Sequence, residues 1–258
     1  YVALSYCWGG PQPTITTSGN IGAHTEALPI HLLPKTICDA IEVTRKLGMR
    51  FLWVDALCII QDDDQDKRKQ IAMMGSIYKN ATFTIAAASA EKVSDGFLSI
   101  LTENQRDSIL HGEPNYHEDD PLFSRGWTLQ EMLLSPRLLI FDAYQLVLSC
   151  EEIGFEPAVP TGIGFEPLCE RLPSSIFGAP KHHEILLKEQ PDEEITTTWF
   201  SIQRDEVWVS LINEYNGRHL SIFDDRLPAL SAIAHELSIF WGGTYVAGFW
   251  KEALIKHL

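Results

Sequence analysis

A tryptophan and a glutamate four residues apart are the residues of this chain best placed to do chemistry. Trp127 and Glu131 lie in the apolar segment 125–134. Their spacing puts both side chains on one face of a helix, and the apolar residues around them predict a helix buried on all sides. An ionised carboxylate is costly to bury alone, so we expect Glu131 to pair with another group, to hold its proton or to line a pocket. Only a carboxylate that lines a pocket would be catalytic.

The elements that would position this helix begin with an alternation of strands and helices. Residues 2–7, 51–55 and 82–88 are short apolar runs typical of strands. The run 51–55 is apolar on both faces, as in a parallel strand covered by helices on each side. Helices are predicted between the strands, one starting at Pro34 and one after the acidic residues 62–66. This order predicts an α/β fold with a doubly wound sheet and right-handed crossovers.

The helix that carries Glu131 is predicted to follow the third strand. A long insertion at residues 89–123 separates the two, and further strands are predicted at 138–141 and 146–150. Since ligands of open α/β sheets bind beyond the carboxyl ends of the strands, we expect the residues that follow the first and second strands to face a ligand.

Composition divides the chain into three parts. Residues 1–152 form the predicted α/β domain. Residues 153–198 are rich in Pro, Gly and acids and are predicted to be a linker or a poorly ordered excursion. Residues 199–258 contain two amphipathic patterns, at 207–215 and 227–237, which predict a helical annex packed on the first domain.

The acidic charge excludes several classes of partner. The formal net charge is −15 over 258 residues, and nucleic acids and anionic lipids are bound by positive surfaces. No stretch is apolar enough to span a bilayer, so we expect a soluble, cytoplasmic protein that binds neither nucleic acid nor membrane. A small anionic substrate remains compatible with this charge, because one arginine and a helix N-terminus can hold it. Arg125 is placed for that role, and a structural ion pair is the alternative.

The cysteines and histidines predict neither a disulfide framework nor a metal site. The five cysteines contain no CxxC pair, which favours a reducing compartment. There is no HExxH motif, and the acidic run at 62–66 lacks the glycine and distal glutamate of a calcium loop. Cys7 and Cys58 lie near strand ends, and each is either a nucleophile or, as is more common, a buried inert thiol.

Several sequence blocks resemble the fungal heterokaryon incompatibility (HET) domain. Four of them lie in the family's order within about the first 150 residues, and two further blocks resemble a segment that often follows. The blocks are Tyr1-Val2-Ala3-Leu4-Ser5-Tyr6-Cys7-Trp8-Gly9; Leu33-Pro34-Lys35-Thr36-Ile37 with Asp39-Ala40; Leu52-Trp53-Val54-Asp55 with Cys58-Ile59-Ile60-Gln61; Arg125-Gly126-Trp127-Thr128-Leu129-Gln130-Glu131; and later Asp225-Arg226-Leu227-Pro228-Ala229-Leu230 and Ala247-Gly248-Phe249-Trp250.

This resemblance implies a fold and an activity. The family triggers cell death when genetically different fungal cells fuse, and its domain is similar to Toll/interleukin receptor (TIR) domains. The implied fold is TIR-like (flavodoxin-like), with a mostly parallel sheet. Some TIR domains cleave NAD with a glutamate in the pattern WxxxE, on a helix after the third strand, and Trp127 and Glu131 match that pattern. The insertion at 89–123 departs from a compact TIR domain.

The resemblance also implies roles for residues around Glu131. NAD would be the substrate, with no cofactor and no metal ion, and Glu131 would stabilise the ribose cation after nicotinamide leaves. Arg125 would meet the pyrophosphate, and Asp55 would accept ribose hydroxyls unless it is a strand-end backbone cap. The other substrate-binding candidates are Ser5, Trp8, Gly9 and Trp127, of which the two tryptophans either stack on a flat ring or pack in the core.

Two hypotheses of function follow. In the first, the chain is an NAD glycohydrolase that depletes the dinucleotide and that self-associates on activation. In the second, it is a noncatalytic TIR-like module that relays a death signal by assembling with itself or with a receptor-type sensor, and Glu131 only pairs with a neighbour such as Arg125. The surroundings of Glu131 separate the two hypotheses.

Overall fold

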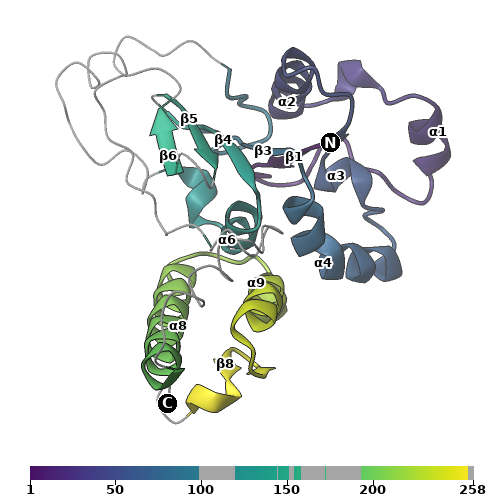
Figure 1. Cartoon of the computed structure of the whole chain (residues 1–258). Coiled ribbons are helices and arrows are strands. Elements are labelled where there is room, and N and C mark those ends of the chain that lie inside the picture. The colour runs from purple at the N-terminus through teal and green to yellow at the C-terminus, as the bar shows by residue number, and fades with distance from the viewer. Residues whose placement is uncertain (99–119, 144, 151–153, 158–171, 173–192, 255–258) are drawn as a thin grey trace.

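A six-stranded sheet with helices on both faces forms the first part of the molecule (Figure 1). The computed structural model describes residues 1–98, 120–143, 145–150, 154–157, 172 and 193–254. The strands, in their order across the sheet, are β2 (Leu52–Trp53), β1 (Val2–Ser5), β3 (Phe83–Ala86), β4 (Arg137–Phe141), β5 (Leu146–Cys150) and β6 (Gly154–Pro157).

The sheet is mixed rather than parallel throughout. Strand β1 pairs in parallel with β2 and with β3, and β3 pairs in parallel with β4. Strands β5 and β6 then add two antiparallel pairings at one edge. The predicted α/β class is therefore confirmed, with four parallel strands and an antiparallel extension.

Helices alternate with the first strands as the sequence predicts. The helices of this part are α1 (Ile21–Glu26), α2 (Lys35–Lys46), α3 (Asp55–Cys58), α4 (Asp64–Lys79) and α6 (Gly126–Leu133), with short 3₁₀ helices at Ile30–Leu32 and Pro121–Ser124. Pro34 precedes α2, and Gly48 beyond its end has a φ of 72°, a conformation that glycine adopts without strain. The carboxylate of Asp63 caps α4 by accepting from the backbone N–H groups of Gln65 and Asp66.

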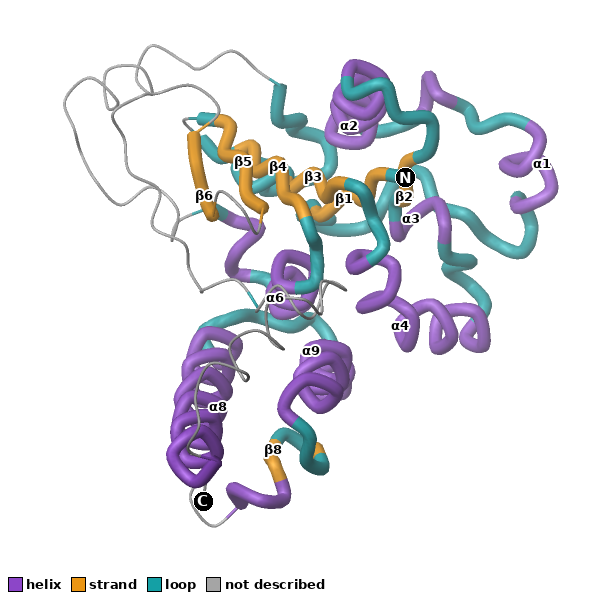
Figure 2. The backbone as a smooth tube through the Cα atoms, in the orientation of Figure 1, coloured by secondary structure: helices purple, strands orange, loops and turns teal. Residues whose placement is uncertain are grey.

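The side chains of β1 alternate between the two faces of the sheet. Leu4 packs with Ile37 of α2 on one face, and Ala3 packs with Tyr78 of α4 on the other. Figure 2 shows α2 on one side of the strands, and α4 and α6 on the opposite side. Because alternate residues of a strand share a face, Ser5 points to the same side as Ala3, toward α4 and α6.

The second strand differs from its prediction. Residues 51–55 were expected to form a strand covered on both sides, but β2 contains only Leu52 and Trp53 and lies at the edge of the sheet. Phe51 is 67% exposed, and Asp55 begins α3 instead of ending the strand. An apolar run alone does not distinguish a central strand from an edge strand whose side chains are half covered.

The annex that follows is built from two long helices. They are α8 (Glu193–Asn216) and α9 (Arg226–Trp241), followed by the short strands β7 (Tyr245–Val246) and β8 (Phe249–Trp250) and by 3₁₀ helices at Phe223–Asp225 and Lys251–Ala253. Trp208 and Trp250 are almost fully buried between these elements, with ring centroids 5.5 Å apart in an edge-to-face arrangement. The annex thus has an aromatic core of its own.

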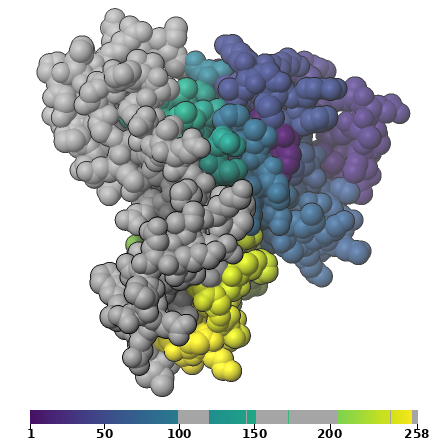
Figure 3. All heavy atoms as spheres, viewed as in Figure 1, coloured from purple at the N-terminus to yellow at the C-terminus, as the bar shows by residue number. Residues whose placement is uncertain are grey.

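Helices α8 and α9 pack against α6 and α4 of the first part. Leu129 and Leu133 of α6 belong to the same apolar cluster as Trp208. Gly75 of α4 lies so close to α9 that a Cβ atom there would be 2.3 Å from the Cβ of Ala232. The yellow surface of α9 adjoins the blue surface of the N-terminal half in Figure 3.

The predicted boundaries of the three parts shift where the structure describes them. Strand β6 lies within the range 153–198 that was predicted to be a linker, and it extends the sheet. Helix α8 begins at Glu193, before the predicted start of the annex at 199. Most of the range 153–198 and of the insertion at 89–123 lies outside the described residues. The division into domain, linker and annex stays a prediction.

Candidate functional site

Helix α6 places Glu131 in the middle of the molecule. The helix spans Gly126–Leu133, and all of its residues except Trp127 are buried. In Figure 1 it lies between the sheet and the helices α8 and α9. Met132 packs against Ile140 of the sheet, whereas Leu129 faces the annex. The prediction of a helix buried on all sides is confirmed, and Glu131 keeps only 4% of its surface exposed.

The Glu131 carboxyl group is enclosed by groups from three elements. Burial raises its pKa, and the positive charge of Arg125 counteracts that rise. The nearby hydroxyls of Ser5 on β1 and Tyr78 on α4 also favour the ionised form, whereas the negative charge of Asp55 disfavours it. Burial has the largest influence, so the net shift of the pKa is upward.

Glu131 has unused hydrogen-bonding capacity. Its Oε2 atom and the Ser5 Oγ atom are buried and have no hydrogen-bond partner of normal geometry in the described part of the chain. The Tyr78 hydroxyl donates to the backbone carbonyl of Leu4 at 3.1 Å, so its proton is engaged elsewhere. A buried carboxylate oxygen without a donor is expensive for the fold, so its presence calls for an explanation.

Arg125 is the counter-charge of this site. It directly precedes α6, and its guanidinium donates to the backbone carbonyl of Tyr6. Burial would lower the Arg125 pKa, but Glu131 and Asp55 reverse this and hold the pKa above its ordinary value. Among the described residues Arg125 forms no ion pair with either acid. The positive charge of Arg125 therefore lowers the pKa of both Glu131 and Asp55 without an ion pair to either carboxylate.

Asp55 and Trp8 form the second half of the cluster. The Trp8 indole N–H donates to Asp55 Oδ2 at 2.8 Å, and Asp55 Oδ1 accepts from the backbone N–H of Ala56 at 2.6 Å. Asp55 is half-buried as a residue, but its carboxyl group is surrounded by protein, and this burial raises its pKa. Arg125 opposes that rise. Asp55 thus hydrogen-bonds the first turn of α3, which agrees with the alternative of a backbone cap.

The loop after β1 is shaped by Gly9. This residue has a φ of 66°, and a Cβ atom there would lie 2.6 Å from the Cα atom of Lys92. Only glycine fits both the conformation and the close approach. Gly9 itself is exposed, and its part in the site is to shape the loop that carries Trp8.

Trp127 shares a helix face with Glu131 but is engaged in packing. It contacts the apolar cluster that contains Met74 and Tyr78, which confirms that this face of α6 points toward α4. Its indole N–H donates to Asp225 Oδ2 at 3.1 Å, immediately before α9. Of the two roles considered for this tryptophan, the contacts match core packing.

The structure therefore brings together Ser5, Trp8, Asp55, Arg125 and Glu131 from the predicted set. It does not bring Gly9 or Trp127 into the cluster of charges.

Tyr6 and Tyr78 also belong to this site, but neither is predicted from the sequence. Burial and the charge of Asp55 raise the pKa of Tyr6, and the Tyr78 hydroxyl borders Glu131. Tyr6 stands in the same block as Ser5 and Trp8, a signal that could have found it. For Tyr78 the sequence indicates only a core position on the buried face of α4.

The cysteines beside the site are poorly suited to act as nucleophiles. Burial raises the pKa of Cys7 to about 11, so its thiol stays protonated at neutral pH. The pKa of Cys58 is also raised, because protein surrounds its thiol although the residue as a whole is exposed. Cys7, Cys38, Cys58 and Cys150 are free thiols. A cysteine hydrolase is therefore the weaker interpretation of this site.

The described residues contain no group of three or more His, Cys, Asp or Glu side chains arranged to hold a metal ion. None of the described helices has both the length and the apolar character needed to cross a bilayer.

Comparisons with known proteins assign the family. The sequence model described as Heterokaryon incompatibility protein (HET) matches residues 1–131, just over half of the chain, and its match ends at Glu131. The chain is 25% identical over 162 residues to heterokaryon incompatibility protein 6, OR allele, of Neurospora crassa, which covers 57% of this chain and 23% of that protein. The chain thus spans about a quarter of the length of this curated relative. No solved structure matches. The chain belongs to the heterokaryon incompatibility (HET) protein family.

Proposed function

We propose that this chain is the cell-death effector region of a HET protein and that it cleaves the nicotinamide N-glycosidic bond of NAD with Glu131. The observation that carries the proposal is the state of Glu131. It is a buried carboxylate with an unpartnered oxygen, it forms no ion pair with any described residue, and Arg125 favours its ionised form. The order β2-β1-β3-β4 of the parallel strands, which matches the flavodoxin-like order, supports the likeness to TIR domains.

NAD cleavage suits a site with one essential carboxylate. Ordinary glycosidases use two, because their leaving oxygen needs a proton. Nicotinamide is bound to the ribose as a cation and takes the electron pair of the breaking C1′–N bond, so it departs neutral without a general acid. Water then attacks C1′ and releases a proton, which gives ADP-ribose. The barrier is set by the positive charge that develops on the ribose, which ionised Glu131 stabilises in a site that excludes water.

The neighbours of Glu131 have supporting roles in this proposal. Arg125 lowers the pKa of Glu131 against the larger effect of burial, and as the cation of the site it also attracts the pyrophosphate. Each oxygen of Asp55 already has one donor, and in this proposal Asp55 fixes the Trp8 indole. Trp8 is half-buried and offers its ring to a flat group. The Ser5 hydroxyl lies beside Glu131, and in this proposal it donates to the substrate ribose.

A noncatalytic assembly module is the second candidate. The observation in its favour is that α6 lies in the core between sheet and annex, so that Glu131 is only 4% exposed. In this candidate, Glu131 helps to hold α6 in the core beneath a surface that binds other proteins, and it contacts no substrate. Both candidates include self-association on activation and a receptor-type partner in the cytoplasm, and neither includes nucleic acid or membrane. The matched region covers 23% of the curated relative, so that relative has room for a partner domain outside the matched region.

Product analysis separates these two candidates. Purified chain, both as a monomer and in a multivalent fusion that forces self-association, is incubated with NAD, and nicotinamide and ADP-ribose are measured by chromatography. We expect release by the assembled wild type, loss of release in Glu131→Gln, and normal release in Glu42→Gln. Glu42 is a matched control because it lies exposed on α2 in an ion pair with Lys46.

The result in cells completes the test. Expression of the same variants in fungal cells should kill with wild type and with Glu42→Gln, and not with Glu131→Gln. If Glu131→Gln kills as efficiently as wild type at equal protein levels, the noncatalytic candidate replaces the enzymatic one.

A further inference from the structure

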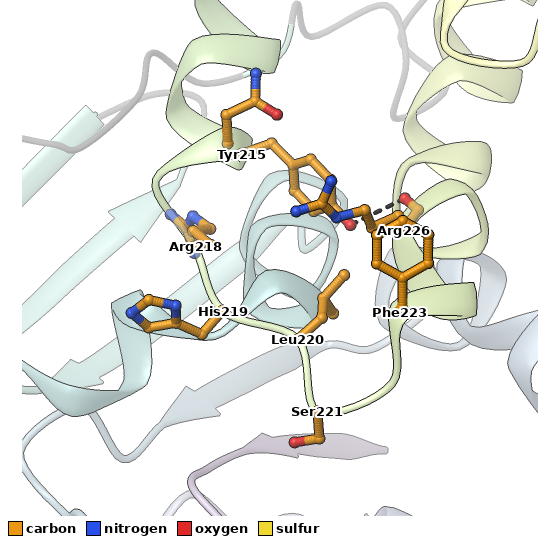
Figure 4. A pocket seen from close by; sticks show the side chains of 8 residues that line it. Tyr215, Arg218, His219, Leu220, Ser221, Phe223 and Arg226 are labelled. Carbon is orange, nitrogen blue, oxygen red and sulfur yellow. Dashed lines mark hydrogen bonds between the residues drawn. The ribbon is translucent and has the colours of Figure 1, made fainter.

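A pocket lies where α8 ends and α9 begins, and none of the residues around the Glu131 carboxyl group lines it. Its volume is about 290 Å³. Figure 4 shows Arg218 and His219 on one side of it and Phe223 and Arg226 on the other, with the Arg226 side chain extending toward Tyr215. The remaining lining residues are Asn216, Leu220 and Ser221.

The lining of this pocket is basic in a strongly acidic protein. It contains two arginines and one histidine and no carboxylate, although the chain as a whole carries a formal net charge of −15. Of the acids nearby, Glu214 pairs with Arg218 at 2.8 Å and Asp225 accepts the Trp127 indole N–H, while Asp224 is exposed and does not line the pocket. An anion that enters the pocket therefore meets cations without meeting a free carboxylate on its wall.

The two arginines are held in different ways. Arg218 is only 9% exposed and is fixed by Glu214 and by a hydrogen bond of 2.8 Å to Thr128 Oγ1 of α6. Arg226 is exposed and makes no ion pair with a described residue, and its guanidinium lies 5.0 Å from the centre of the Phe223 ring. Arg226 thus keeps the donors of its planar fork available, in a geometry that suits a phosphate group.

The pocket also offers flat apolar surface beside these donors. The Phe223 side chain is 74% exposed, and the Tyr215 ring is fixed by its hydroxyl, which donates to the Arg226 carbonyl at 2.9 Å. We propose that this pocket binds a small phosphate-bearing ligand, with Arg226 and His219 as the main donors to the phosphate. The volume is at the low end for ligand sites, so it favours a ligand of the size of a mononucleotide over a dinucleotide.

The wall of the pocket is attached to the start of α6. The backbone N–H of Gly126 donates to the His219 carbonyl at 2.7 Å, and the His219 N–H donates to the Ser124 carbonyl at 2.6 Å. A Cβ atom at Gly126 would lie 2.6 Å from the Leu220 side chain, so the two segments are in close contact. A ligand that orders residues 215–226 therefore also orders the first turn of the helix that carries Glu131.

Binding is tested on the whole chain with two probes, inorganic phosphate and adenosine monophosphate, by calorimetry against a chloride control of equal ionic strength. We expect saturable binding, weakened about tenfold or more in Arg226→Ala, since a charge-assisted hydrogen bond is worth about 1.5–3 kcal/mol. Arg50→Ala is the matched control, because Arg50 lies 5.7 Å from the centre of the Phe51 ring, outside the pocket. Tighter binding of the nucleotide than of phosphate would assign a role to the Phe223 ring.

The effect on α6 is read by hydrogen exchange, which is independent of NAD cleavage. Bound probe should slow exchange of the Gly126 amide in wild type and in Glu131→Gln, and not in Arg226→Ala. Absence of saturable binding, or an equal loss in Arg50→Ala, would overturn the proposal. Because Glu131→Gln removes the proposed catalysis and leaves the pocket intact, a failure of the pocket is distinguishable from a failure of the enzymatic proposal.

Discussion

Arg125 and Glu131 favour each other's charged forms without forming an ion pair. Glu131 raises the pKa of Arg125, and Arg125 lowers the pKa of Glu131 against the larger, opposite influence of burial. A direct ion pair would use up the oxygens of the carboxylate, whereas charge compensation without an ion pair leaves Oε2 without a partner. This arrangement keeps an acid ionisable inside the fold and leaves it ready to interact with another group.

The first prediction concerns the stability of the fold. The pKa of Glu131 is raised above its ordinary value of 4.5, so the folded state holds a proton to higher pH than the unfolded state does. Ionisation of Glu131 therefore destabilises the fold as pH rises above 4.5. We expect Glu131→Gln to raise the Tm by a few degrees at pH 7.5, with a gain that shrinks as the pH falls toward 4.5. A lower Tm in Glu131→Gln at pH 7.5 would contradict this.

The second prediction concerns the pH dependence of activity. If ionised Glu131 is required, NAD cleavage should decline as the pH falls through its raised pKa. Arg125→Gln removes the main influence that holds this pKa down, so the acid limb of the pH–rate profile should move to higher pH. Arg45→Gln, an exposed change on α2, should leave the profile in place. An acid limb at the same pH in Arg125→Gln would show that Arg125 does not tune the carboxylate.

The third prediction concerns the bond between Trp127 and Asp225. Trp127→Phe keeps an aromatic ring in the core and removes the donor, and Asp225→Asn removes the charge of the acceptor. In a double-mutant cycle followed by chemical denaturation, we expect a coupling energy on the order of 1 kcal/mol. Strict additivity of the two changes would mean that this hydrogen bond does not help to hold α9 against α6.

Much of the scaffold is predictable from the sequence, because it follows from local patterns. Pro34 and the apolar spacing define α2, and the four-residue spacing of Trp127 and Glu131 gives their shared helix face. The position of α6 after β3 follows from the strand count. These features depend on periodicity and capping, which neighbouring residues determine.

Features set by distant contacts were not predictable in the same way. Strand β6 lies in a Pro- and Gly-containing repeat, and it becomes a strand only because the edge of β5 is available for pairing. Asp55 bonds to Trp8, which is 47 positions away, so its sequence position alone suggested a strand end. Tyr78 borders Glu131 because α4 crosses the same face of the sheet, a relationship that no local pattern contains.

The fourth prediction concerns the contact between the annex and the first part. A Cβ atom at Gly75 would meet Ala232 of α9, so Gly75→Ala should push α4 and α9 apart and destabilise the fold by about 1–3 kcal/mol. Gly22→Ala on α1 is the control, since a Cβ atom there meets nothing within 4 Å and alanine favours helix. Denaturation curves of both variants decide the matter. Equal stability of Gly75→Ala and wild type would mean that the annex does not depend on this close approach.

The most direct test of the central claim measures two quantities on one preparation of Glu131→Gln, the rate of nicotinamide release in the assembled state and the thermal stability. The proposed role of Glu131 predicts that release from NAD is lost while the Tm rises, because the buried charge stabilises the transition state at the expense of the fold. Release at the wild-type rate from a well-folded Glu131→Gln assembly, or no release from assembled wild type, would contradict it.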